Sequence, residues 1–129
     1  MLTIKRFIGM YDDNYGPRTR SKLLEKWVNE LSKIIFIQGW TKKMLPKIGL
    51  NRIHFAFLDA QHTEEDVLRE FKFVSDRQQA GDILVFDDVT HLLFPGVCKA
   101  VDLIAKRYPY KVEKVNFSEK RGYAIATRI

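Results

Sequence analysis

The amino-acid sequence predicts an α/β fold built on a mostly parallel sheet. Strand-like apolar runs alternate with amphipathic helical segments, two of these runs are apolar almost throughout, and the last two strand-like runs are spaced as a hairpin. Such alternation is typical of parallel sheets covered by helices, and continuous apolar runs are typical of strands buried on both faces. A chain of 129 residues is long enough for one domain with a core, so residues 1–129 are expected to form a single domain.

In the first third of the chain, TIKRFIGMY (residues 3–11) predicts a strand and DDNYGPR (12–18) a turn at a Gly-Pro pair. Residues 20–32 predict a helix, because apolar side chains recur on one helical face; these are Leu23, Leu24, Trp27, Val28 and Leu31. KIIFIQG (33–39) is β-branched and predicts a short strand. TKKMLPKI (41–48) predicts a short helical or irregular connection that Pro46 limits.

The rest of the chain repeats strand and helix before the final pair. RIHFAFLD (52–59) predicts a buried strand, and Thr63 opens a capping box for a helix that runs to about residue 78. DILVFDD (82–88) predicts the next buried strand, and residues 95–108 predict an amphipathic helix. YKVEKVNF (110–117) and GYAIATRI (122–129), joined by SEKR, predict an antiparallel pair.

Both buried strands end in carboxylates, with Asp59 after the first and Asp87-Asp88 after the second. Ligands of open α/β sheets bind at the carboxyl ends of strands, and carboxylates that converge there repel one another unless a cation lies between them. Oxygen ligands of this kind suit Mg²⁺. The alternative is that each aspartate only caps the next helix or begins a turn. For the three together, the sequence favours a metal or ligand site.

Composition excludes several other classes. The single cysteine rules out a disulfide framework, and neither a membrane-spanning run nor a signal-peptide core is present, so a cytoplasmic protein is expected. The net charge of +6 permits an anionic partner, but the lysines and arginines are scattered, which argues against a specific nucleic-acid groove. A phospho-receiver is disfavoured as well, because receivers place their acidic pair before the single aspartate.

The segments FAFLDAQHTEEDVLREFKFV, GDILVFDDVTHLLFPGVCKAVDLIAKRYPYKVEKV and RGYAIATR together resemble the C-terminal half of a class I S-adenosylmethionine-dependent methyltransferase. They are most similar to the metal-dependent O-methyltransferases of catechol and macrocin type. KIIFIQGWTKKMLPKI resembles the third strand of that family and the segment after it, and FIGMYD resembles its second strand more weakly. The resemblance covers residues 33–129 and implies a Rossmann-like sheet with strand order 3-2-1-4-5-7-6.

The glycine-rich loop that follows the family's first strand, approximately E-x-G-x-x-x-G, has no counterpart in this sequence. We therefore expect the first β-α unit to be missing. Without it, the sheet would keep an exposed edge or a gap that another chain could fill, which allows a homo-oligomer through that edge.

The resemblance implies the following site residues. Asp59, Asp87 and Asp88 match the family's divalent-metal ligands, which hold the substrate hydroxyl oxygens. Gln61 replaces an aspartate proposed as the general base in macrocin-type members, and His62 is the candidate for that catalytic role. His62 is otherwise a solvated neighbour of the helix cap.

The cofactor residues implied by the resemblance are Asp12, for the ribose, and Gly39, Trp40 and Thr41, for the adenine. Trp40 departs from the small or acidic residue usual at its position, and turn formation alone would also explain Asp12.

Two functions follow. The first is S-adenosylmethionine-dependent O-methylation of a small-molecule acceptor with Mg²⁺. The second is a truncated, catalytically silent module that acts in oligomerisation or protein interaction.

Overall fold

A computed structural model of the chain describes residues 2–5, 10–13, 16–19, 22 and 24–129; up to residue 18, and at Phe117, the description covers the backbone only. The chain divides into two compact units. The larger consists of Met1–Lys5 and Trp40–Ile129, and the smaller of Arg6–Gly39. Each unit is described by itself.

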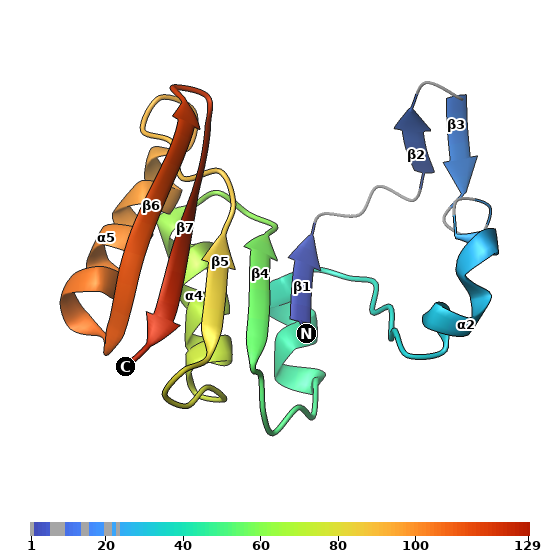
Figure 1. Ribbon diagram of the computed structural model, residues 1–129, viewed down its shortest axis with the longest axis horizontal. Helices are drawn as coiled ribbons and strands as arrows, with labels where there is room; N and C mark the ends of the chain where they lie inside the picture. Colours follow the sequence, from blue (N-terminus) through green and yellow to red (C-terminus); the bar gives the residue numbers. More distant parts are fainter. Residues whose placement is uncertain (1, 6–9, 14–15, 20–21, 23) are drawn as a thin grey trace. The chain divides into compact units, whose positions relative to one another are not determined.

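A five-stranded mixed sheet forms the larger unit (Figure 1), with strand order β1-β4-β5-β7-β6. Its strands are β1 (Leu2–Lys5), β4 (Phe55–Asp59), β5 (Ile83–Phe86), β6 (Tyr110–Ser118) and β7 (Arg121–Arg128). β1, β4 and β5 run parallel, whereas β7 is antiparallel to both β5 and β6. The predicted α/β sheet with a C-terminal antiparallel pair is confirmed.

β1 lies beside β4, with Leu2 opposite Ala56 and Lys5 opposite Asp59. In the strand order implied by the resemblance, this is the place of the family's first strand, so β1 lies where an exposed edge or a gap was expected. The predicted strand at residues 3–11 was wrong in its extent. β1 ends at Lys5 and a separate strand, β2 (Met10–Asp13), begins at Met10, with residues 6–9 outside the described part.

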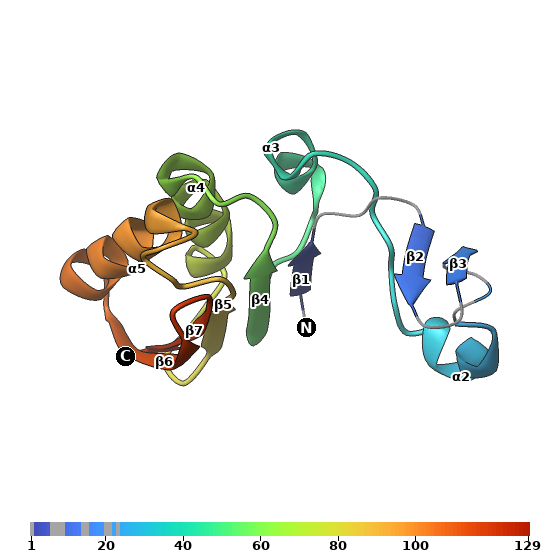
Figure 2. The same cartoon turned by 90° about the horizontal axis from the view of Figure 1, so that it is seen from above.

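Helices α4 (Glu64–Ser75) and α5 (Pro95–Arg107) lie with the short α3 (Thr41–Met44) on one face of the sheet (Figure 2). The core between the two long helices and the sheet contains the largest fully buried apolar side chains, which are Phe71, Val74, Leu84, Phe86, Cys98, Val101 and Ile104. Burial alternates along β5 and β7, and Ile83 and Ile125 on the other face are each 37% exposed. The helices cover only one face of β5, so the expectation that both of its faces are buried was wrong.

The predicted capping box at the start of α4 is confirmed, since the Thr63 hydroxyl accepts a hydrogen bond from the Asp66 amide at 3.2 Å. The helix ends at Ser75, three residues earlier than predicted. The connection that follows includes Gly81, whose φ of 92° favours glycine. α3 and the 3₁₀ turn η2 (Leu45–Lys47) confirm the short helical connection around Pro46.

The smaller unit differs most from the sequence prediction. The turn expected at residues 12–18 was wrong in its extent, because residues 12–13 and 16–18 belong to two short paired strands, β2 and β3 (Gly16–Thr19). The helix predicted for 20–32 is described only as η1 (Glu25–Trp27) and α2 (Val28–Leu31), with Trp27 and Val28 exposed. The strand predicted for 33–39 is absent from the described structure, because no neighbouring strand there supplies a ladder of hydrogen bonds.

Candidate metal and ligand site

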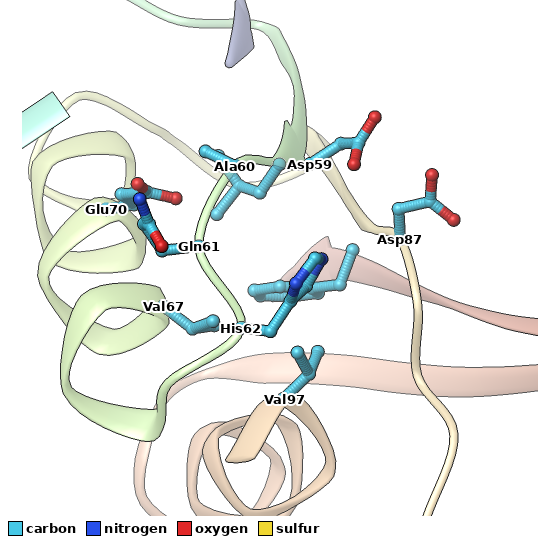
Figure 3. A pocket seen from close by; sticks show the side chains of 10 residues that line it. Asp59, Ala60, Gln61, His62, Val67, Glu70, Asp87 and Val97 are labelled. Carbon is cyan, nitrogen blue, oxygen red and sulfur yellow. The ribbon is translucent and has the colours of Figure 1, made fainter. Parts of the chain in front are cut away.

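The carboxyl ends of β4 and β5 bring the predicted aspartates together. Leu58 pairs with Phe86 in parallel register, and the Asp87 amide donates to the Leu58 carbonyl at 3.0 Å. Asp59 and Asp87 therefore follow adjacent positions on neighbouring strands, as predicted, and their carboxyl groups project to the same side in Figure 3.

Asp88 turns away from the strand path. Its φ of 56° lies in the left-handed region, which aspartate tolerates better than most residues. The Asp88 amide donates to Oδ1 of Asp87 at 2.8 Å, and this contact fixes the backbone between the two residues. The turn brings Oδ2 of Asp88 to 3.0 Å from Nε2 of His62.

His62 is held from both sides. Its ring packs on Phe94 with centroids 4.1 Å apart. The backbone beneath it touches the start of α5 so closely that a Cβ added to Gly96 would lie 2.5 Å from the His62 carbonyl oxygen and 2.9 Å from the Glu64 amide nitrogen. Only glycine permits this approach, so the α5 N-terminus fixes the loop that carries His62.

Asp59, His62 and Asp88 each offer a ligand atom, and these three atoms all lie within 4.8 Å of one another. All three residues are half-buried. Among the described residues, this is the group that could hold a metal ion, and Asp87 is not part of it. The structure thus joins two of the three predicted ligands with the predicted catalytic histidine.

A buried carboxyl group that the sequence analysis did not single out lies behind this group. Glu70 on α4 is only 1% exposed, and it lines a cavity of about 10 Å³ together with Asp59, Gln61 and His62. Its Oε1 atom has no hydrogen-bond partner in the described part of the chain. Burial raises the pKa of Glu70 to about 7, although a hydrogen bond with Thr41 works in the opposite direction. The signal was its position one turn after Val67, on the apolar face of the helix.

The predicted cofactor residues fall into both units. Trp40 and Thr41 line an open pocket of about 430 Å³ with Lys42, Gln61 and Asp66, and the Trp40 side chain is 66% exposed. Gly39, with φ 148°, and Asp12, at the third position of β2, belong to the smaller unit, and the side chain of Asp12 lies outside the description.

Comparison with known proteins gives one family and a set of similar folds. The model of a family described as a methyltransferase domain matches residues 10–89, which is more than half of the chain and includes parts of both units. A search of curated proteins found no match. In the described part of the chain, no helix is long and apolar enough to cross a membrane.

Among solved structures, cofactor-bound Rv0187 from MTB is 14% identical with a TM-score of 0.67, over 81% of this chain and 52% of that one. The O-methyltransferase TomG from Streptomyces achromogenes, in complex with SAM, is 16% identical with a TM-score of 0.61, over 84% and 58%. An O-methyltransferase from Bacillus cereus, in complex with SAH, is 12% identical with a TM-score of 0.64, over 84% and 56%. These likenesses establish the Rossmann-like fold, and the chain spans little more than half the length of each neighbour.

Proposed function

Because the chain belongs to the methyltransferase-domain family, we propose that it serves in S-adenosylmethionine-dependent O-methylation of a small molecule with the help of a divalent metal ion. The observation that carries this proposal is the convergence of Asp59, His62 and Asp88 at the ends of two adjacent parallel strands. Neighbours of similar fold that bind SAM or SAH support the choice of cofactor.

The donor set fits a divalent ion, because carboxylate oxygens and an imidazole nitrogen are ligands of such ions. When bound, the ion would supply Lewis acidity that lowers the pKa of an acceptor hydroxyl. Asp59 and Asp88 hold negative charge at the place where the ion would lie. Asp87, predicted as a third ligand, adds negative charge beside Asp59 and orients the Asp88 backbone through its Oδ1.

His62 has two chemical roles open to it in this group. As a general base, it would take the proton of the acceptor hydroxyl, which suits an imidazole near neutral pH. As a ligand, it would donate the Nε2 lone pair to the ion.

An acceptor has room in a pocket whose lining begins at Val89, one residue after Asp88. This pocket of about 640 Å³ is lined by Val89, His91 and Leu92 after β5 and by Asn116 and Ser118 at the β6–β7 turn. Its mixed apolar and polar lining and its size suit a small organic molecule. We therefore place the methyl acceptor there.

The cofactor residues predicted from the resemblance fit the adenosine end of S-adenosylmethionine better than its sulfonium end. The exposed Trp40 ring offers a flat surface for an adenine, and Asp12 and Gly39 stay assigned to the ribose and adenine as proposals. Lys42 and Lys43 line the same pocket and disfavour a positively charged sulfonium nearby. Since no glycine-rich loop follows β1 in the sequence, we expect this chain to bind the cofactor weakly.

Saturation-transfer NMR with S-adenosylmethionine tests the cofactor assignment, because it detects weak binding. We expect transfer mainly to the adenine protons, lost in Trp40→Ala and kept in Trp27→Ala, which removes an exposed tryptophan of the other unit. Adenine signals that survive Trp40→Ala would contradict the assignment of this pocket. Tight stoichiometric binding in calorimetry would contradict the expected weakness.

We also propose that both units belong to one domain, because the family match runs across residues 10–89. The second candidate function, a catalytically silent interaction module, is favoured by the exposed apolar side chains of Ile34, Ile35, Phe36 and Ile37. Sedimentation of the wild type and of Ile35→Lys tests it. Association that increases with concentration and is lost in the variant would support this function, and a monomer at every concentration would contradict it.

A further inference from the structure

The contact between His62 and Asp88 is short, yet it is not a hydrogen bond. Nε2 of His62 lies 3.0 Å from Oδ2 of Asp88. The same nitrogen is shielded from solvent and makes no hydrogen bond within the described residues. The two atoms therefore approach without the alignment of an N–H···O bond. Their separation is compatible with two ligands that each lie about 2.0–2.2 Å from one ion.

A third donor completes the arrangement. A ligand oxygen of Asp59 lies within 4.8 Å of both atoms, so the three donors come from the end of β4, the loop before α4 and the turn after β5. These segments are held independently of any ion, by the β4–β5 register, by the packing of Phe94 on His62 and by the Asp87–Asp88 contact. A site built on supported elements keeps its ligands in place before the ion binds.

We propose that Asp59, His62 and Asp88 form a single metal site in which His62 is a ligand through Nε2, and that this site prefers a first-row transition-metal dication to Mg²⁺. The inference rests on the proposed metal-assisted function and specifies the class of ion that the site prefers. His62 would then hold the ion, and the proton of the acceptor hydroxyl would pass to another base or to solvent water.

Donor chemistry gives the preference its direction. Mg²⁺ selects oxygen ligands and near-ideal octahedral geometry. Imidazole nitrogen suits Zn²⁺, Fe²⁺, Co²⁺ and Ni²⁺, and affinities for mixed nitrogen and oxygen sites rise along the first row from Mn²⁺ to Cu²⁺. Two carboxylates alone would give only a weak preference over Mg²⁺, so the nitrogen of His62 supplies most of the selectivity.

Calorimetry on the tag-free full chain, stripped with a chelator, tests the inference with CoCl₂ and MgCl₂ as probes. We expect the wild type to bind Co²⁺ more tightly than Mg²⁺. Loss of an outer-shell partner already lowers metal affinity about 10- to 100-fold, so His62→Ala should lower Co²⁺ affinity at least that much. Mg²⁺ affinity should stay unchanged. His54→Ala, an exposed histidine before β4, is the matched control and should bind both ions as the wild type does.

Co²⁺ also provides a spectroscopic test that does not depend on activity. The visible absorption bands of the bound ion should shift when His62 is replaced. His62→Gln, which keeps a polar side chain of similar size, serves for this measurement if His62→Ala does not fold. Co²⁺ affinity and spectrum that are equal in the wild type and in both His62 variants would overturn the inference.

Failure of His62 as a ligand can be distinguished from failure of the proposed metal-assisted function. If Asp59→Asn and Asp88→Asn weaken both ions while the His62 variants change neither, His62 is not a ligand and the metal-assisted function stands. If the wild type binds neither ion, the inference and the proposed metal assistance both fail.

Discussion

Glu70 gives the sharpest prediction about stability, because its carboxyl group is buried and only partly paired. The structure places it at 1% exposure with Oε1 unpartnered among the described residues, and burial raises its pKa from 4.5 to about 7. The ionised form is therefore disfavoured in the folded state relative to the unfolded chain. Since the folded pKa is raised, the stability linked to Glu70 is fully present below pH 4.5 and is lost as the pH rises through about 7.

The size of the effect follows from the shift. A difference of about 2.5 pKa units corresponds to about 3.5 kcal/mol at about 1.4 kcal/mol per unit. Most of this falls between pH 5 and pH 8, over which Glu70 should lower the free energy of unfolding by about 2.5 kcal/mol. Glu70→Gln keeps the shape of the side chain and cannot ionise, so this share of the pH dependence should disappear in the variant.

Urea unfolding, followed by circular dichroism at several pH values between 5 and 8, measures this difference. The quantity compared is the change in unfolding free energy with pH in the wild type minus that in Glu70→Gln, so that other titrating groups cancel. Glu65→Gln removes an exposed carboxylate of the same helix and should leave the wild-type pH dependence nearly unchanged. Parallel curves for the wild type and Glu70→Gln would refute the assignment of a raised pKa to Glu70.

Two further substitutions test the packing around the site. Gly96→Ala should destabilise the protein by about 1–3 kcal/mol, because the new Cβ would lie 2.5 Å from the His62 carbonyl oxygen. The control, Gly49→Ala, should change the stability little, because nothing lies within 4 Å of its Cβ. Equal unfolding midpoints of the two variants in urea would contradict this prediction. Tyr110→Phe removes the buried hydrogen bond to Oε1 of Gln78 at 2.7 Å and should cost about 1–3 kcal/mol by thermal unfolding, while an unchanged melting temperature would show that water replaces the hydroxyl.

Much of the larger unit could be predicted from the sequence, because local and long-range signals agree there. The continuous apolar run that ends at Asp59 and the capping box at Thr63 place β4 and α4 within a few residues. The prediction failed for residues 33–39, where β-branched composition favours a strand but a strand forms only beside a partner, which no pattern within the segment reveals. The helix predicted around Trp27 is short for a related reason, since none of the residues of η1 and α2 is buried and packing therefore does little to stabilise it.

The candidate site was predictable in part. Strand ends at one edge of a parallel sheet meet, so Asp59 and Asp87 could be placed side by side from the sequence. The approach of His62 to Asp88 could not, because it depends on a left-handed residue and on packing of the Phe94 ring. Glu70 was missed since it looks like one charged residue among several on α4, although its position one turn after Val67 places it on the apolar face of that helix.

The central claim is that Asp59, His62 and Asp88 share one divalent ion. X-ray diffraction from crystals of the chain soaked in CoCl₂, measured at the cobalt absorption edge, tests it most directly. We expect an anomalous peak at the ends of β4 and β5, at about 2.0–2.2 Å from a carboxylate oxygen of each aspartate and from Nε2 of His62. A fully soaked crystal with cobalt bound elsewhere and no peak among these three side chains would contradict it.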